Sequence, residues 1–327
     1  MIICRTPMRV SLLGGGTDIP SYYEQHGGDV ISLAIKKYTY ITLHPKYGDG
    51  LRISYSRTEN VTRLSNVEHP LVRSVLTESN LNLPLEITSI AEVPSKGTGL
   101  GSSSSFTVGL INAISHFLES PRSRSDLAES AWKIESLTSS DGIGKQDQYA
   151  VAHGGFNRFQ FLESGEVVVG NFNLDIDFQK ILLESLYLVD SGISRQASKL
   201  LTSQLESYKT SAQSTAARHA IKSSVELGAI ALKDCNLQNF AQILSETWEF
   251  KKLFGNVSNN EIDSIYRYGL SHGAIGGKLL GAGGGGFFLF IVPKTQQVEF
   301  MDGMSRLKKN VLKVELDTEG TSIVYKS

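Results

Sequence analysis

The stretch that decides the fold is Pro94-Ser95-Lys96-Gly97-Thr98-Gly99-Leu100-Gly101-Ser102-Ser103-Ser104-Ser105. It follows a strand-like segment at 85–93 and leads into apolar residues with helical spacing that begin near Ser102. Small residues let a backbone approach an anion closely, and the amides and dipole of a helix N-terminus favour negative charge. The stretch therefore predicts a strand, a phosphate-holding loop and a helix in succession.

Two better-known phosphate loops do not fit the glycine patterns of this chain. The stretch lacks the closing Gly-Lys-Ser/Thr of a Walker loop, and Ser102 stands where a dinucleotide fold requires its third glycine. Gly281, Gly283 and Gly286 match G-x-G-x-x-G, but a strand follows them instead of a helix. A surface loop capped by serines stays as the structural alternative, because serine is favoured at helix N-caps.

A further glycine segment lies near the start of the chain, where Arg9-Val10-Ser11-Leu12-Leu13-Gly14-Gly15-Gly16-Thr17-Asp18 surrounds a tight turn. Taken alone, such a segment is explained equally well by an ordinary turn between two strands. We refer to the segments 9–18, 94–105 and 281–286 as motifs 1, 2 and 3.

Hydrophobic periodicity divides the chain into a strand-rich first half and a helix-rich second half. The predicted boundary lies near residue 175, which gives two domains, 1–175 and 176–327. The predicted strands are 38–43, 52–55, 85–93, within 155–169, 287–292 and 311–316. The predicted helices start near 102 and 145 and cover 126–139 and much of 194–271.

Composition excludes several classes of protein. The 32 basic and 33 acidic residues nearly cancel, which argues against nucleic-acid binding and favours a small-molecule substrate. No signal-peptide pattern or membrane-spanning run occurs, so we expect a cytoplasmic protein without membrane association. The two cysteines, Cys4 and Cys235, predict buried thiols in a reducing compartment. No histidine or cysteine pattern supports a zinc site.

Taken together and in this order, the three motifs resemble the signature motifs of the GHMP kinases, over almost the whole chain. That resemblance implies an α+β, two-domain fold with an N-terminal ribosomal-protein-like β-α-β domain and a C-terminal ferredoxin-like domain. The wording of 5–18, and that of 142–149 and 192–195, is closest to the heptose 7-phosphate kinase branch. Galactokinases carry Gly-Glu-His where this chain has Gly14-Gly15-Gly16. The implied reaction is ATP-dependent phosphorylation of the anomeric hydroxyl of D-glycero-D-manno-heptose 7-phosphate, for nucleotide-activated heptose and surface polysaccharide.

The resemblance also assigns the transfer machinery. Asp147 is the implied acceptor of the hydroxyl proton, and Arg9 lies near it and the γ-phosphate. Glu135 and Ser103 are the implied ligands of Mg²⁺, which takes few protein oxygens and keeps several waters. The structural alternatives are a helix N-terminal carboxylate for Asp147 and a solvated helix face for Glu135.

Binding residues follow in the same way. ATP is expected to contact motifs 2 and 3, at Pro94, Lys96, Gly97, Gly99, Leu100, Gly101, Ser102, Ser103, Ser104, Ser105, Gly283 and Gly284. The sugar is expected to contact Gly16, Thr17, Asp18 and Gly144, with Asp18 as the main determinant of specificity. A phosphorylated sugar also needs a cationic clamp, for which the candidates are Arg195, Lys251 and Lys252.

Three other functions stay open at this point. A kinase for another sugar, of the fucose or mannose type, would share every ATP-site residue. A non-catalytic ATP- and sugar-binding sensor is disfavoured because Arg9, Glu135 and Asp147 are all present. A diphosphate decarboxylase is disfavoured by motif 1. The oligomeric state is open, a homodimer included.

Overall fold

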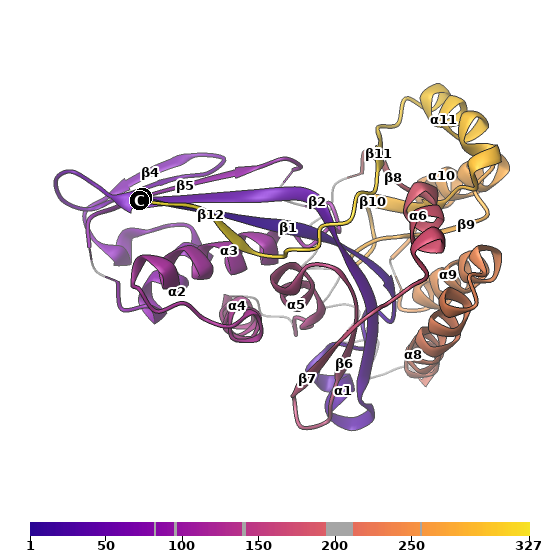
Figure 1. Ribbon diagram of the computed structural model, residues 1–327, viewed down its shortest axis with the longest axis horizontal. Coiled ribbons are helices and arrows are strands. Elements are labelled where there is room, and N and C mark those ends of the chain that lie inside the picture. Colours follow the sequence, from indigo (N-terminus) through magenta and orange to yellow (C-terminus); the bar gives the residue numbers. More distant parts are fainter. Residues whose placement is uncertain (82, 95–96, 139–141, 194–211, 256) are drawn as a thin grey trace.

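The computed structural model describes residues 1–327 except 82, 95–96, 139–141, 194–211 and 256. Two β-sheets, each with its own helices, lie side by side and are joined by the long strands β1 (Ile2–Leu13) and β2 (Gly28–Pro45) (Figure 1). The second sheet begins only after residue 185. This is the two-domain α+β architecture that the family resemblance implies.

The first sheet has eight strands, in the order β12-β1-β2-β5-β3-β4, with β6 pairing with β2 and β7 with β6. Its pairs are antiparallel except β3 with β5. The bounds of its other strands are β3 Leu51–Ser54, β4 Thr58–Val61, β5 Leu85–Ala91, β6 Phe156–Phe161, β7 Val167–Asn171 and β12 Ser322–Lys326.

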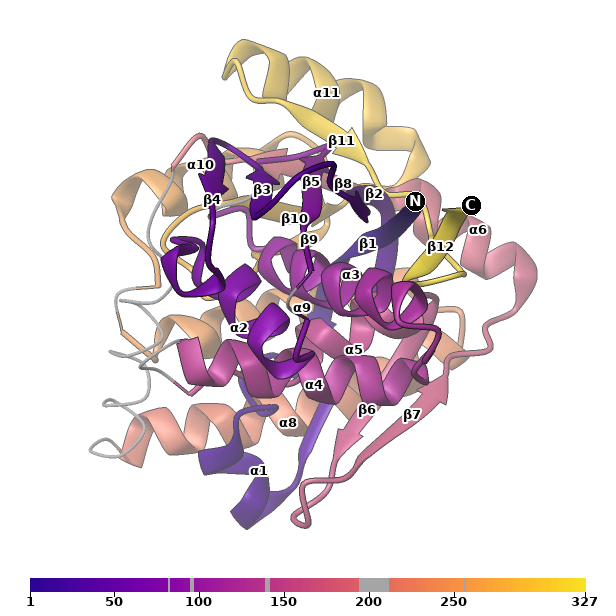
Figure 2. The ribbon, with the colours of Figure 1, turned by 90° about the vertical axis from the view of Figure 1, so that its left-hand side faces the viewer.

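Helices cover one face of this sheet (Figures 1 and 2). They are α2 Pro70–Glu78, α3 Ser102–Phe117, α4 Arg124–Thr138 and α5 Gln146–His153. The central helix is α3, whose apolar residues Val108, Leu110, Ile111 and Ile114 are buried in one core with Ile41, Leu43 and Ile87 of the sheet. Elsewhere lie α1 Pro20–His26 and the 3₁₀ turn η1 Leu64–Asn66.

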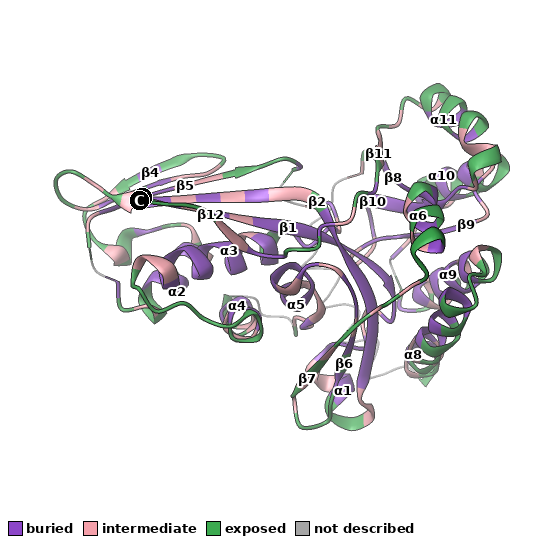
Figure 3. Cartoon of the chain, in the orientation of Figure 1, coloured by how far each residue is buried: buried purple, intermediate pink, exposed green. Residues whose placement is uncertain are grey.

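The second sheet is antiparallel, with four strands in the order β11-β8-β10-β9. Its strands are β8 Leu186–Asp190, β9 Gly276–Leu279, β10 Phe287–Ile291 and β11 Val311–Lys313. Its helices are α6 Ile176–Ser185, α8 Ala212–Lys233, α9 Leu237–Lys252, α10 Asn260–Ser271 and α11 Gln297–Arg306, preceded by η2 Lys294–Gln296. Every residue of β10 is buried, because helices or loops cover both of its faces (Figure 3).

Most predicted elements are confirmed, and some were missed. The helix after motif 2 begins at Ser102 as predicted. The elements that were not predicted include the strands β4, β8, β9 and β12 and the helices α1, α2, α6 and α11. The most consequential of these is β12, which pairs with β1 and returns the C-terminus to the first sheet, so that the amino group of Met1 donates to the Ser327 hydroxyl at 2.7 Å. The two chain ends accordingly lie side by side (Figure 2).

Two further expectations have simple outcomes. Cys4 is buried, but Cys235 is exposed, so the prediction of two buried thiols is wrong for Cys235. That residue follows the end of α8 with a φ of 54°, a left-handed turn conformation that places it at the surface. No helix in the described part of the chain is long and apolar enough to cross a membrane.

Candidate active site

Motifs 2 and 3, about 180 residues apart in the chain, pack against each other backbone to backbone. A Cβ atom placed on Gly281 would lie 2.5 Å from the Cα atom of Gly99, and one on Gly99 would lie 2.9 Å from the carbonyl oxygen of Leu280. The amide of Phe287 donates to the carbonyl of Thr98 at 3.0 Å. Glycine is required at this contact because any side chain would force the two loops apart.

The predicted ATP-binding residues occupy different positions around this contact. Ser102, Ser104 and Ser105 are buried, whereas Ser103 is exposed at the start of α3. The Ser102 hydroxyl meets that of Thr98 at 2.9 Å, and Ser105 donates to the carbonyl of Thr6 at 3.0 Å. Ser103 is therefore the serine whose side chain is open to a ligand.

The remaining residues of motifs 2 and 3 are placed as follows. Leu100 is buried and its carbonyl accepts the Arg9 amide at 3.0 Å. The amide of Gly284 is already bonded to the carbonyl of Val257 at 2.8 Å. The glycines at 97, 99, 101, 283 and 284 all have positive φ, Pro94 is exposed, and Lys96 lies outside the described residues.

Arg9 joins motif 1 to the start of α5 and to motif 2. Its Nε donates to Oδ1 of Asp147 at 2.8 Å and its Nη2 to Oδ2 at 2.7 Å, while Nη1 donates to the carbonyl of Gly99 at 2.5 Å. The Arg9 side chain is 3 % exposed and that of Asp147 is 26 % exposed. The buried guanidinium thus orients a carboxylate that can still reach a ligand.

Asp18, in motif 1, also contacts the first turn of α5. Its Oδ1 accepts the amide of Gly16 at 2.9 Å, and its Oδ2 accepts the amide of Gln146 at 3.1 Å. Burial raises the pKa of Asp18, and the neighbouring charge of Asp147 raises it further. Gly144 leaves room for this carboxylate, since a Cβ there would lie 1.9 Å from Oδ2.

The other predicted sugar contacts are more heavily engaged within the protein. The Thr17 hydroxyl donates to the carbonyls of Gly14 at 2.8 Å and Asp29 at 3.0 Å, which holds the turn of motif 1 closed. The carbonyl of Gly16 accepts from Arg218 of α8 at 2.7 Å. Arg218, which was not predicted, is a buried cation beside motif 1.

Glu135 lies in a buried polar cluster, not on a solvated helix face. It is 4 % exposed, and its Oε2 accepts from Ser104 at 3.0 Å and from Gln148 at 2.8 Å. Burial raises its pKa to about 7, against the lowering effect of the hydrogen bonds from Gln148 and Ser104. Its Oε1 is buried without a hydrogen-bond partner among the described residues, which suits a cation.

This arrangement fits Mg²⁺ at Glu135. Besides the predicted ligands Glu135 and Ser103, two further residues contact the Glu135 carboxylate. Ser104, not Ser103, is the serine that contacts the carboxylate, and Gln148 was not predicted at all. Gln148 lies directly after Asp147, so one turn of α5 carries the groups that hold Arg9 and Glu135. In the described residues no cluster of three or more His, Cys, Asp or Glu side chains could hold a metal.

The clamp candidates have three different outcomes. The ammonium group of Lys251 is buried and donates to the carbonyls of Leu279, at 3.2 Å, and Gly281. Lys252 forms an ion pair with Glu249 at 2.7 Å on the same helix. Arg195 lies outside the described residues, so a clamp for the distal phosphate stays a prediction.

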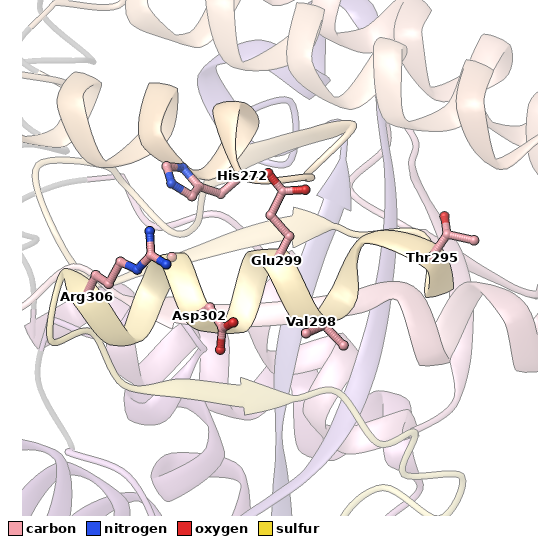
Figure 4. Close-up of a pocket in the computed structure, with 7 residues that line it drawn as sticks. His272, Thr295, Val298, Glu299, Asp302 and Arg306 are labelled. Atoms are coloured by element: carbon pink, nitrogen blue, oxygen red, sulfur yellow. The ribbon is translucent and has the colours of Figure 1, made fainter.

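A separate hollow of about 480 Å³ lies along α11, on the second domain (Figure 4). Its lining residues are His272, Thr295, Val298, Glu299, Asp302, Gly303 and Arg306. None of them belongs to the three motifs or to α5, so the hollow is distinct from the site described above.

Comparisons with known proteins agree with this geometry. The family described as GHMP kinases N terminal domain matches residues 69–155, and GHMP kinases C terminal matches 229–308. The D-glycero-alpha-D-manno-heptose 7-phosphate kinase of Campylobacter jejuni is 32% identical over 97% of this chain and 96% of its own. A crystal structure of a D-glycero-D-manno-heptose 1-phosphate kinase from Bacteroides thetaiotaomicron superposes with a TM-score of 0.82, 26% identity and full coverage of both chains.

A more distant relative is the bifunctional fucokinase/GDP-fucose pyrophosphorylase of Arabidopsis thaliana, 24% identical over 90% of this chain and 30% of that longer protein. The same family is indicated by both family descriptions, by the heptose kinase relative that matches over its full length, and by the shared fold. The chain therefore belongs to the GHMP kinases and is a phosphotransferase that acts on a hydroxyl acceptor.

Proposed function

We propose that this protein transfers the γ-phosphoryl group of ATP to the anomeric hydroxyl of D-glycero-D-manno-heptose 7-phosphate and releases the 1,7-bisphosphate and ADP. The observation that carries the proposal is the 32% identity, over 97% of the chain, with a heptose 7-phosphate kinase. The product would enter the synthesis of nucleotide-activated heptose for surface polysaccharide, in the cytoplasm. The protein would act alone or as a homodimer.

Asp147 is the proposed acceptor of the hydroxyl proton, because its carboxylate is partly exposed and is oriented by two hydrogen bonds from Arg9. As the oxygen–phosphorus bond to the sugar forms and the bond to ADP breaks, the hydroxyl proton passes to Oδ1 or Oδ2. The guanidinium of Arg9 offsets negative charge at the transferred group. Transfer of this kind relies on positioning and charge neutralisation more than on covalent chemistry by the protein.

Motifs 2 and 3 are the proposed phosphate cradle. Their glycines bring two loops into backbone contact next to the N-terminus of α3, where the helix dipole favours anions. Glu135 would hold Mg²⁺, with Ser103 as the second protein ligand. When bound, the ion would neutralise charge on the ATP phosphates.

Sugar recognition is proposed at Gly16, Thr17, Asp18 and Gly144. Asp18 is the strongest candidate, because it lies next to Gln146 and Asp147 at the start of α5. The distal phosphate would be bound by Arg195 or Lys251.

Turnover on a panel of acceptors tests this proposal. ADP release would be followed with Mg²⁺ and ATP on heptose 7-phosphate, heptose 1-phosphate, mannose 6-phosphate, mannose, fucose and galactose. Phosphorus NMR of the product would identify the phosphorylated position. Efficient turnover on heptose 7-phosphate alone, with a new anomeric phosphate, is the expected result. Turnover only on a sugar without phosphate would overturn the substrate assignment.

Two alternatives keep the phosphoryl transfer and change the acceptor. A fucose-type kinase is favoured by the similarity to a fucokinase over 90% of this chain. Heptose 1-phosphate as the acceptor is favoured by the neighbouring structure of a heptose 1-phosphate kinase. ATP binding without turnover on any acceptor would instead favour a sensor.

A further inference from the structure

Three buried cations lie together beneath the glycine motifs. Arg9 is 3 % exposed, Lys251 9 % and Lys278 4 %. They are close enough that the charge of Arg9 helps to lower the pKa of Lys251, and the charges of Lys251 and Arg9 help to lower that of Lys278. Of these three cations, only Arg9 has a carboxylate partner among the described residues, Asp147.

Each cation donates to the backbone carbonyl of a different motif. Lys278 of β9 reaches across the domain junction to the carbonyl of Leu12 in motif 1, at 2.7 Å. Arg9 of motif 1 donates to the carbonyl of Gly99 in motif 2. Each motif is therefore held in place by a side chain that belongs to a different segment of the chain.

The third contact is made from a helix. Lys251, in the last turn of α9, donates to the carbonyls of Leu279 and Gly281 at the entrance to motif 3. Gly281 is the residue whose backbone touches Gly99. The hydrogen bond from Lys251 to the Gly281 carbonyl therefore fixes the contact between motifs 2 and 3.

Two buried ammonium groups without carboxylate partners cost stability, since an apolar side chain could fill the same space without desolvating a charge. Desolvation lowers the pKa of Lys251 to about 7 and lowers that of Lys278 well below its usual value. A bound polyanion would offset this cost by supplying negative charge close to the cluster. The hollow along α11 offers no comparable arrangement, because it is lined by carboxylates of Glu299 and Asp302 as well as by Arg306.

We propose that Lys251 and Lys278 are positioning residues for the nucleotide. Lys251 binds backbone carbonyls at motif 3 and Lys278 binds one in motif 1, which leaves the backbone amides of these motifs facing the triphosphate. The two side chains also place positive charge on the side of the motifs opposite the triphosphate. This inference rests on the proposed function for the identity of the ligand, a nucleoside triphosphate. It gives Lys251 a different role from a clamp on the sugar phosphate, and the two roles predict different kinetic effects.

The test uses Lys251→Met and Lys278→Met, with Lys222→Met as the matched control. Lys222 also donates to a backbone carbonyl across the two domains, that of His26, which belongs to none of the three motifs. Binding of a non-hydrolysable ATP analogue with Mg²⁺ would be measured by calorimetry at pH 7.5, in two buffers with different heats of ionisation. KM values for ATP and for the sugar phosphate would be measured alongside.

We expect both test variants to bind the analogue about tenfold or more weakly, as for loss of a charge-assisted contact, and the control to bind within twofold of the unmodified protein. The unmodified protein should take up protons on binding, because the triphosphate restores full charge to Lys251, and Lys251→Met should reduce this uptake. Lys251→Gln keeps an N–H donor and replaces the methionine variant if thermal unfolding shows the latter to be misfolded.

Two results would overturn the inference while leaving the proposed kinase function intact. One is analogue affinity within twofold of the unmodified protein in both variants. The other is a Lys251→Met variant in which only the KM for the sugar phosphate rises. A protein that turns over sugar phosphate but shows no proton uptake would remove the charge argument. Failure of the unmodified protein to bind the analogue would overturn the proposed function together with this inference.

Discussion

Arg9 and Asp147, 138 residues apart in the chain, form a two-pronged ion pair through Nε–Oδ1 and Nη2–Oδ2 contacts of 2.8 and 2.7 Å. The pair connects strand β1 to the first turn of α5, at the place where motif 2 also contacts Arg9. Its geometry fixes the direction in which the Asp147 carboxylate faces. The candidate site is organised around this contact.

Asp147→Asn should abolish most of the turnover while nucleotide binding persists. Asparagine has nearly the same shape and can still accept one of the two hydrogen bonds from Arg9 through its amide oxygen, but it cannot take a proton from a hydroxyl group. We expect kcat to fall by about 10²- to 10⁴-fold, with the Kd for an ATP analogue within twofold of the unmodified protein. Steady-state kinetics and calorimetry measure the two quantities. A kcat reduced less than about tenfold would remove Asp147 as the proton acceptor.

Glu135→Gln should stabilise the metal-free protein at alkaline pH. The folded-state pKa of Glu135 is raised from 4.5 to about 7, so its destabilising effect is absent well below pH 4.5, grows as pH rises from 4.5 to 7 and is constant above 7. Ionisation of the buried carboxyl costs up to about 3 kcal/mol at pH 8, which glutamine avoids. Urea unfolding without metal, at pH 5 and pH 8, should show a much larger gain for the variant at pH 8 than at pH 5.

The same variant separates metal binding from folding. If Glu135 holds Mg²⁺, addition of the ion should stabilise the unmodified protein at pH 8 and leave Glu135→Gln unchanged. Equal stabilisation of both proteins by Mg²⁺ would place the ion elsewhere.

Gly281→Ala should disrupt the contact between motifs 2 and 3. The φ of Gly281 is +63°, and an added Cβ would lie 2.5 Å from the Cα of Gly99, in a place where backbone must move. We expect the Kd for an ATP analogue to rise about tenfold or more. Gly48→Ala is the matched control, since its φ is +80° and it has nothing within 4 Å of an added Cβ. If both variants bind nucleotide equally well, the close approach of the two loops is not needed for binding.

His153 should make the protein less stable in mild acid. Its burial, and the charge of Arg124, lower its pKa from 6.5 to about 4 in the folded state. The stability that depends on neutral His153 is therefore complete above pH 6.5 and is lost as pH falls from 6.5 to 4. Because the ring is only partly buried, we expect a loss of about 1–2 kcal/mol. His153→Gln should lose less stability than the unmodified protein between pH 7 and pH 5, as measured by urea midpoints, and equal losses would contradict the assignment.

Local patterns in the sequence determined the elements that carry the motifs. The switch from alternating to helical periodicity near Ser102 predicted the start of α3, because side-chain period follows from backbone geometry alone. The small residues of motif 2 predicted a loop whose backbone can approach an anion, and Gly99 and Gly101 have the positive φ that favours glycine; its contact with motif 3 was not predicted. The strand β12 was not predicted because it is short, lies at a sheet edge and is largely exposed, so its apolar and polar side chains do not alternate clearly.

The tertiary structure alone decided which side chains meet. Nothing in the neighbourhood of Arg9 or Asp147 specifies their contact, and only the family resemblance suggested it. Lys278 gave one unused signal, a lone lysine between apolar residues just before motif 3, but its carbonyl partner in β1 is 266 residues away. Contacts of this kind depend on how two domains pack, and packing depends on the whole core. The sequence therefore determined the local elements and the chemistry available, while long-range packing brought three cations and two carboxylates to the junction of the glycine motifs.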